Sequence, residues 1–372
     1  MQIVFVLEYY PPHLGGIEIV FQNVATRLAN RGHDVTVVTS RTGDTNKREQ
    51  RDGVEVWRCP VIDSLDRYTF TATGIPAAVQ AAQEADVIHT STWTGVAPGW
   101  LASRLTGTPA LCTVHEVFEP IWHLTDRGPV DTALHRALEQ AVFALSFDRY
   151  TTVSEYTLKC LQDRGVRSRD VDVVYNGIDN DLFDPETVEP GRLEAAGIDA
   201  EFVFTYFGRP GFSKGVEYLV EAAPAVFERV EDAHLLLLLD DMPRDRYDDI
   251  QQRIDDLGIR DSVTVLDPVE RQALPQYVGN ADCAVVPSLS EGFGFTAAEA
   301  CALEVPVVAT TAGSLPEVVS GEHVLVEPAD AEALAEGIVR VADGRADFRE
   351  RRTFDWEDAV EGYLAAYRSL LQ

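Results

Sequence analysis

The sequence predicts an α/β protein with two lobes, each built around a mostly parallel sheet. The first observation is length, because 372 residues exceed what one hydrophobic core usually serves. The second is pattern, since short apolar strands alternate with amphipathic helices along most of the chain. The third is a single interruption at residues 176–190, where the periodicity is lost. We therefore expect an interlobe linker there.

The first lobe is expected to cover residues 1–178. A strand at residues 2–8 is followed by a Pro/Gly loop at residues 11–16 and then by a helix with an apolar stripe. A second strand at residues 35–39 completes a βαβ unit, whose strands are parallel by construction. The same alternation predicts four more strands in this lobe, at residues 86–89, 110–115, 150–154 and 171–175.

The second lobe is expected to cover residues 179–355 and to repeat this alternation. Its strands are predicted at residues 202–207, 234–239, 263–266, 283–286, 305–309 and 324–326. A last helix is predicted at residues 356–371, with Ala359, Tyr363, Ala366 and Leu370 on one stripe. Open parallel sheets bind ligands at the carboxyl ends of their strands, so we expect the two lobes to face a central cleft that holds the site.

The charge balance excludes some partners. The chain carries 61 acidic and 31 basic residues, a net charge of −30, and its only lysines are Lys47, Lys159 and Lys214. Nucleic acid is not expected as a partner, because its phosphates would be repelled. The composition resembles that of haloarchaeal cytosolic proteins, whose self-repulsion molar salt screens. The five scattered cysteines predict buried free thiols in a reducing compartment.

The sequence also predicts where the protein resides. The segment from Met1 to Phe5 has no basic leader and no cleavage site, so it is expected to be a first strand rather than a signal peptide. The densest apolar run, Leu235 to Leu239, is too short to span a bilayer. We expect a cytoplasmic protein. Peripheral contact with the membrane is left open, although no basic amphipathic helix supports it.

The strongest chemical signal is residues 287–300, which follow a buried strand and open a helix. Glu291 and Glu299 frame two glycines, which allow an anion to approach the helix N-terminus closely. Each carboxylate can accept hydrogen bonds from two neighbouring sugar hydroxyls, and charge at Glu291 would favour an oxocarbenium-like transition state. The alternatives are a capping box from Thr296 to Glu299 and a solvated loop residue at position 291.

A second signal is Gly208 to Gly215, also between a strand and a helix. Arg209 can fork onto phosphate oxygens and Lys214 can act as a point charge, which together suit a diphosphate. The alternative is a surface loop with two solvated charges. A third segment, Gly15-Gly16 after the first strand, could bring backbone amides close to a substrate, or could be only a tight turn.

Histidines and carboxylates give weaker signals. His89 and His115 are expected to end strands of the first lobe and to face the cleft, with His115 the better candidate for a sugar hydroxyl. No metal site is expected. The D-x-D at Asp170 and Asp172 enters a strand, so strand alternation explains it better, and the pair Asp240 and Asp241 at a strand end is only a possible ligand set.

Together these segments resemble the retaining family-4 glycosyltransferases of the GT-B fold, which pair two Rossmann-like lobes, over essentially the full length. The segments that carry the resemblance are residues 11–18, 31–35, 176–179, 208–215 and 291–299. The resemblance implies a metal-independent hexosyltransferase that takes a UDP- or GDP-sugar and needs no cofactor. It also implies that the helix at residues 356–372 packs back onto the first lobe.

The resemblance assigns roles to residues. Arg209 and Lys214 would neutralise the donor diphosphate, Glu299 would hold the ribose hydroxyls, and Glu291 would contact the donor sugar. Gly16 and His115 would contact the donor from the first lobe, and His115, Arg209, Lys214 and Glu291 are the catalytic candidates. The backbone amides that would hold donor hydroxyls and phosphate belong to Gly292, Phe293, Gly294 and Phe295.

Substrate identity stays open. The acceptor could be a lipid-linked glycan, another lipid or a polysaccharide, and its candidate loops are residues 60–75 and 117–135, including Trp122, Leu124 and Arg127. The turns at residues 240–243 and 267–268 depart from the family pattern, which leaves the nucleotide base open. Two other functions remain: a nucleotide-sugar epimerase of the same fold, and a non-catalytic scaffold, which would need none of the charged set.

Overall fold

The computed structural model describes residues 1–13, 15–62, 65–93, 95–118, 121–122, 128–266 and 269–372. These residues form two compact units. The first contains residues 1–122, 128–177 and 355–372, and the second contains residues 178–354. Within the first unit, Gly177 lies against the start of the terminal segment, since a Cβ on Gly177 would be 2.4 Å from the backbone nitrogen of Trp356.

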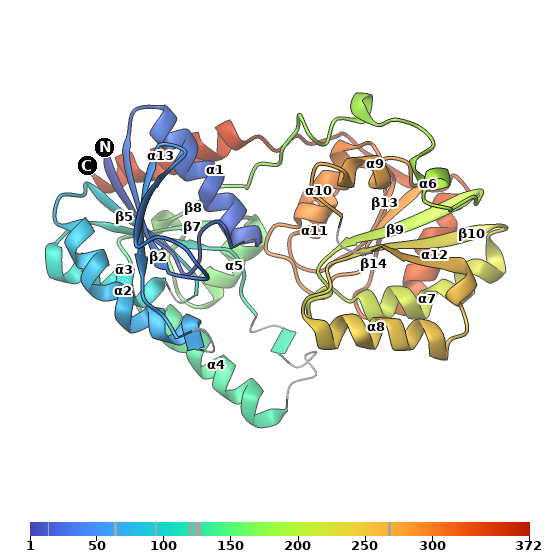
Figure 1. The fold of residues 1–372 in the computed structure, drawn as a ribbon, viewed down its shortest axis with the longest axis horizontal. Helices are drawn as coiled ribbons and strands as arrows, with labels where there is room; N and C mark the ends of the chain where they lie inside the picture. The colour runs from blue at the N-terminus through green and yellow to red at the C-terminus, as the bar shows by residue number, and fades with distance from the viewer. Residues whose placement is uncertain (14, 63–64, 94, 119–120, 123–127, 267–268) are drawn as a thin grey trace. The chain divides into compact units, whose positions relative to one another are not determined.

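The first unit is an eight-stranded sheet in the order β3-β4-β2-β1-β5-β6-β7-β8, parallel except for β3 (Figure 1). Its strands are β1 (Gln2–Val6), β2 (Asp34–Ser40), β3 (Arg48–Arg51), β4 (Val54–Cys59), β5 (Val87–Ser91), β6 (Ala110–Val114), β7 (Arg149–Thr152) and β8 (Val171–Val173). Its helices are α1 (Gly16–Asn30), α2 (Asp66–Ala82), α3 (Val96–Thr106), α4 (Pro129–Phe143), α5 (Glu155–Asp163), the 3₁₀ turn η3 (Ser168–Asp170) and α13 (Trp356–Leu370). The sequence did not predict β3 and β4.

The second unit is a seven-stranded sheet in the order β11-β10-β9-β12-β13-β14-β15, parallel except for β15. Its strands are β9 (Phe202–Gly208), β10 (Ala233–Leu239), β11 (Val263–Leu266), β12 (Cys283–Val286), β13 (Val307–Thr310), β14 (Gly321–Val326) and β15 (Asp347–Arg349). Its helices are α6 (Arg192–Ala195), α7 (Val216–Arg229), α8 (Arg244–Asp256), α9 (Leu274–Val278), α10 (Phe295–Ala302), α11 (Leu315–Val318) and α12 (Ala331–Ala342), with 3₁₀ turns η4 (Pro185–Thr187) and η5 (Arg260–Ser262).

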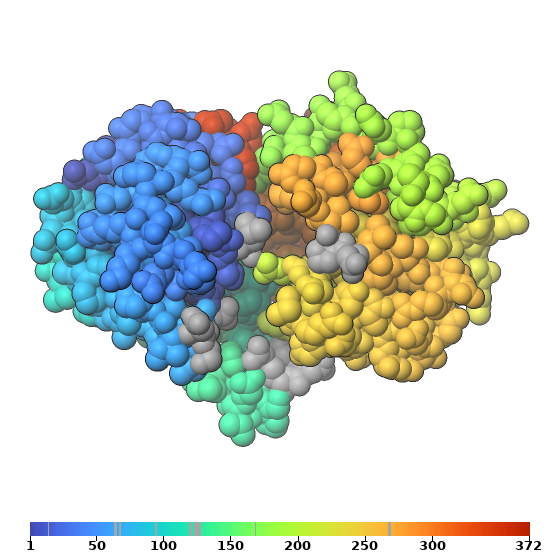
Figure 2. Space-filling view, in the orientation of Figure 1, coloured from blue at the N-terminus to red at the C-terminus, as the bar shows by residue number. Residues whose placement is uncertain are grey.

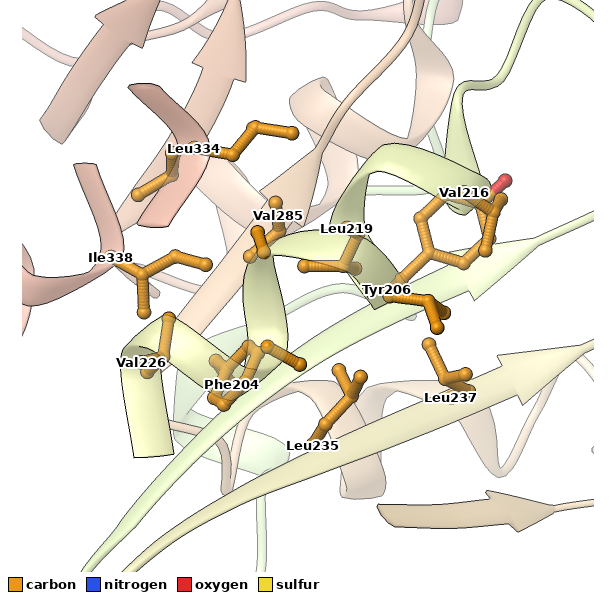
Figure 3. Packing of buried hydrophobic residues seen from close by; sticks show 14 of the residues in the cluster. Phe204, Tyr206, Val216, Leu219, Val226, Leu235, Leu237, Val285, Leu334 and Ile338 are labelled. Carbon is orange, nitrogen blue, oxygen red and sulfur yellow. The ribbon is translucent and has the colours of Figure 1, made fainter. Parts of the chain in front are cut away.

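Each sheet is buried by helices, as the uninterrupted apolar runs of its strands require. In the second unit, Phe204 of β9, Leu235 of β10, Leu219 of α7 and Ile338 of α12 belong to one buried cluster (Figure 3). All five cysteines are buried and free, so the predicted burial of the thiols is confirmed. Among the described residues, none of the helices combines the length and the apolar character needed to cross a bilayer.

The terminal helix α13 belongs to the first unit. Tyr363 and Tyr367 are fully buried there, and the Tyr367 hydroxyl lies 2.6 Å from Nδ1 of His89 in β5. At the surface, Arg31, the C-cap of α1, bonds Glu361 at 2.7 Å. The stripe that the sequence predicted on this helix therefore faces inward at Ala359, Tyr363 and Ala366.

Candidate functional site

The two strongest sequence motifs lie side by side at one edge of the second sheet. Strands β9 and β12 are parallel neighbours, so the loops that follow them leave the sheet at the same end. The loops are joined directly, because the Leu289 amide donates to the Ser213 carbonyl at 2.7 Å. A Cβ on Gly215 would lie only 2.1 Å from the Pro287 carbonyl oxygen, so only glycine permits this approach.

Lys214 and Glu291 meet between these loops. The Lys214 Nζ lies 2.7 Å from the Glu291 Oε1, and the buried Ser288 hydroxyl donates to the same oxygen at 2.8 Å. The Glu291 side chain is 8% exposed and that of Lys214 33%. Burial and two partners exclude the alternative of a solvated loop carboxylate at position 291. One third of the Lys214 side chain remains exposed.

The backbone of Glu291 is held from a third loop. Its carbonyl accepts the Ser314 amide at 3.0 Å and the Ser314 hydroxyl at 3.2 Å. Gly313, with a φ of 58°, passes so close that a Cβ there would lie 2.1 Å from the same carbonyl oxygen. The position of Glu291 therefore depends on a glycine that the motif itself does not contain.

Glu299 lies on α10 and is 3% exposed. Its Oε1 accepts a hydrogen bond from Nη2 of Arg271 at 2.7 Å. Burial raises the pKa of this carboxyl, and the Arg271 charge opposes the shift. The helix begins after Gly294 without a side-chain cap, so the capping-box alternative from Thr296 is wrong. Arg271 was missed by sequence reasoning, because no motif surrounds it.

Arg209 lies at the end of β9 and is half exposed. Its Nε contacts the Asp240 Oδ2 at 3.0 Å, across the end of β10. The Tyr206 hydroxyl donates to the Arg209 carbonyl at 2.9 Å, which fixes the backbone under the guanidinium. The structure therefore pairs the two predicted cations with different carboxylates, Lys214 with Glu291 and Arg209 with Asp240. Asp240, considered above as a possible metal ligand, has this cation as its partner.

In the first unit, Gly16 begins α1, and Gly15 is its N-cap. A Cβ on Gly15 would lie 2.3 Å from the Glu18 Oε2, the end of a flexible side chain that would have to move aside. The Glu18 Oε1 lies 3.1 Å from Nδ1 of His13, and the His13 ring stacks on Tyr9 with centroids 4.2 Å apart. The loop is thus a tight turn closed by its own side chains.

The two candidate histidines differ in their surroundings. His89 lies in the middle of β5, and its ring nitrogens are bonded to Tyr367 and Thr113, each at 2.6 Å. The prediction that His89 ends a strand and faces a cleft is therefore wrong, since β5 extends two residues further. His115 follows β6, is 8% exposed, and its buried Nε2 has no partner among the described residues.

Other predicted positions have structural roles or fall outside the description. Asp172 forms an ion pair with Arg149 across β7 and β8, with Nη2 2.8 Å from its Oδ1, in agreement with strand alternation. Trp122 is buried, and its indole donates to Glu139 at 2.7 Å. Leu124, Arg127 and the turn at 267–268 lie outside the described residues.

Acid is expected to destabilise the first unit. Burial lowers the pKa of His115 to about 4, and that of His89 well below its ordinary value. In the unfolded chain both imidazoles bind protons near pH 6.5, whereas in the folded protein they bind them only at lower pH. Protonation therefore favours the unfolded state, and the free energy of unfolding decreases as the pH falls from 6.5 toward 4. The expected loss from His115 alone is about 3 kcal/mol. Urea unfolding followed by tryptophan fluorescence measures it, because all five tryptophans, at positions 57, 93, 100, 122 and 356, lie in this unit.

The control for that experiment is His115→Gln, which should flatten much of the slope between pH 6.5 and 4. An unchanged slope in this variant would show that other groups cause the acid sensitivity.

Comparison with known families accounts for both units. Residues 14–182 match Glycosyltransferase Family 4, and residues 201–343 match Glycosyl transferases group 1. This chain is a glycosyltransferase built from these two family domains. The D-inositol 3-phosphate glycosyltransferase of Mycobacteroides abscessus is 29% identical, with 95% of this chain and 84% of the relative covered. An uncharacterized glycosyltransferase of Methanocaldococcus jannaschii is 28% identical, with 92% and 89% covered.

Solved structures confirm the GT-B fold of this glycosyltransferase. HepE of Anabaena, solved in complex with UDP, matches with a TM-score of 0.76 at 21% identity, over 99% of this chain and 100% of that one. Sucrose-phosphate synthase of Thermosynechococcus elongatus matches with a TM-score of 0.78 at 21% identity, over 100% and 99%. The predicted pair of Rossmann-like lobes is thereby confirmed. The family matches confirm the predicted class of enzyme, a glycosyltransferase.

Proposed function

We propose that this glycosyltransferase moves a hexose from a nucleoside-diphosphate sugar to an acceptor hydroxyl with retention of configuration. The observation that carries the proposal is the pairing of Lys214 with Glu291 beside the N-terminal end of α10. A partly exposed lysine side chain and helix amides without a side-chain cap suit a diphosphate, and a buried carboxylate next to them suits sugar hydroxyls. The solved complexes of HepE with UDP and with UDP-glucose support this class of donor.

On binding, the donor would form new contacts with side chains that are already paired with one another in the structure. In the structure the Lys214 charge is balanced by Glu291, and in the complex it would also face the diphosphate. The Oε1 of Glu299 is held by Arg271, while its Oε2 accepts no hydrogen bond from the described residues and can take ribose hydroxyls. Arg209, which is half exposed beside Asp240, would add a second positive charge.

The reaction breaks the bond between sugar C1 and the phosphate oxygen and forms a bond from C1 to the acceptor oxygen on the same face. The acceptor proton passes to the leaving phosphate oxygen. Positive charge from Lys214, Arg209 and the α10 amides stabilises the departing diphosphate, which is why we infer transfer without a metal ion. In the first unit, the proposed substrate contacts are the turn at Gly16 and His115, whose Nε2 bonds none of the residues that the structure describes.

For the acceptor we propose only a chemical class: a lipid-linked glycan, a polysaccharide or another polyol. D-Inositol 3-phosphate enters as a test compound because it appears in the name of a relative. The surplus of 61 acidic over 31 basic residues further supports a proposed adaptation to molar salt, so assays belong in concentrated KCl.

The proposal is tested with labelled UDP- and GDP-sugars, offered with and without each acceptor, in buffer containing EDTA. Transfer should need one donor and one acceptor and should persist in EDTA, with NMR of the product showing the anomeric configuration of the donor. Release of an altered nucleotide sugar without acceptor would indicate an epimerase. An absence of both reaction and donor binding would indicate a scaffold, and an inverted product would refute retention.

A further inference from the structure

Arg271 lies in a turn just before α9, outside the motifs that the sequence singled out. The turn is closed by the Leu274 amide, which donates to the Arg271 carbonyl at 3.3 Å. At the other end of the side chain, the guanidinium carbon lies 5.2 Å from the centre of the Phe183 ring, which is 1% exposed. A closed turn and an aromatic face therefore hold the Arg271 side chain in one direction.

The ring that contacts Arg271 belongs to the segment at residues 178–200, which opens the second unit. This segment, green in Figure 2, lies against α9, where the Gln276 side chain donates to the Thr187 carbonyl at 2.8 Å. The contact between Phe183 and Arg271 thus joins two parts of the second unit that are also hydrogen-bonded to each other elsewhere.

Glu299 is the residue on which this arrangement acts. Its side chain is 4% exposed, and Nη2 of Arg271 donates to its Oε1 at 2.7 Å. Its Oε2 accepts no hydrogen bond from the residues that the structure describes. One oxygen of the carboxylate is therefore anchored and the other remains available, which sets the direction from which hydroxyl groups can donate to it.

The charge of Glu299 also depends on Arg271. Burial raises the pKa of the Glu299 carboxyl, the charge and the hydrogen bond of Arg271 lower it, and the negative charge of Asp179 raises it. Without Arg271, a carboxyl in such surroundings binds a proton rather than remain charged. A neutral carboxyl is the weaker acceptor, since charge-assisted hydrogen bonds are about twice as strong as neutral ones.

We propose that Arg271 is a positioning residue for Glu299, and that this contact gives the donor site its selectivity for a ribose with both hydroxyls. The inference rests on the proposed function, because it concerns the nucleotide of the same donor. Two neighbouring hydroxyls can donate together to an anchored carboxylate. A nucleotide without them leaves that carboxylate with no donor in place of water, which is the kind of mismatch that a polar site rejects strongly.

The test is calorimetric titration of the full chain with UDP and GDP and with their 2′,3′-dideoxy forms. The wild type should bind the ribonucleotide that it accepts more tightly than its dideoxy form. Arg271→Met should weaken ribonucleotide binding about 10- to 100-fold, the range for a hydrogen bond to a charged group, and leave dideoxy binding nearly unchanged. Arg271→Lys keeps a positive charge and should recover part of the loss. In sugar transfer, KM for the donor should rise with kcat little changed.

A pH series distinguishes this role from a purely structural one. The ratio of the two Kd values cancels effects of pH on the phosphates. In Arg271→Met the ratio should be close to one at about pH 6 and recover toward about pH 9, because Glu299 is charged only above its pKa and loses the cation that lowers it. The matched control is Arg192→Met, which removes another arginine of this unit, 4.3 Å from the centre of the Tyr277 ring, and should bind as the wild type does.

Thermal unfolding verifies that the variants fold. Equal affinity of the wild type for both nucleotide forms, a wild-type ratio in Arg271→Met, or a loss in this variant that is the same for both forms would overturn the inference and leave the proposed function intact. If Arg271→Met does not fold, Arg271→Lys decides, and a wild-type ratio there would overturn the inference. A wild type that binds neither UDP nor GDP would count against the proposed function itself, and the inference would fall with it.

Discussion

Lys214→Ala is expected to lower kcat/KM for the donor about 100- to 1000-fold, the range for removing one group that stabilises developing charge. Lys214 is the cation nearest to Glu291, at 2.7 Å, and the diphosphate takes on charge as it leaves. The loss should fall mainly on kcat, because the interaction strengthens in the transition state. Initial rates of sugar transfer measure it.

Two controls separate charge loss from damage to the fold. Lys159→Ala removes an exposed lysine of α5 in the first unit and should leave kcat/KM unchanged. Lys214→Arg keeps a positive charge and should recover part of the rate. Equal activity in Lys214→Ala and wild type would remove Lys214 from the mechanism.

Gly313→Ala is expected to destabilise the second unit by about 2–4 kcal/mol, as the sum of left-handed strain and a steric clash. The added Cβ would lie 2.1 Å from the Glu291 carbonyl oxygen and 2.7 Å from its nitrogen, so that residue must move. Because a displacement of about 1 Å can cost about 100-fold in rate, transfer should nearly vanish. Calorimetry and rate assays on the full chain measure the two effects.

Gly344→Ala is the matched control. Gly344 belongs to the same unit and has a φ of 66°, close to the 58° of Gly313, but its Cβ would meet nothing within 4 Å. Both variants carry the same backbone strain, so their difference isolates the contact with Glu291. If the two variants unfold and react alike, Gly313 has no special role in positioning Glu291.

The fold was predictable where apolar runs alternate with helices. The β9 and β12 strands, buried along their length, stand out in the sequence, and the motifs that follow them could be expected to meet. Charged Glu55 and Arg58 interrupt the apolar residues of strand β4, and β15 is exposed at all three positions, so neither presents a continuous apolar run. Each of these strands forms by pairing with an adjacent strand, and the sequence does not show which strands will be adjacent.

The candidate site was predictable only in part, for a similar reason. Glu291, Glu299 and Lys214 belong to local motifs, whereas Arg271 reaches Glu299 across 28 residues of sequence. The sequence placed His89 at the end of a strand, where a side chain can reach a ligand. Strand β5 runs two residues further, so His89 lies in the core instead. On α4, helical periodicity locates an apolar stripe but cannot show that buried Glu139, not Leu134, faces inward.

The most direct test is a crystal structure of the full chain with the nucleotide sugar that supports transfer. The account predicts the diphosphate within hydrogen-bond distance of Lys214 Nζ and the ribose hydroxyls on the Oε2 of Glu299. A nucleotide bound away from both side chains, with the ion pair of Lys214 and Glu291 undisturbed, would contradict it.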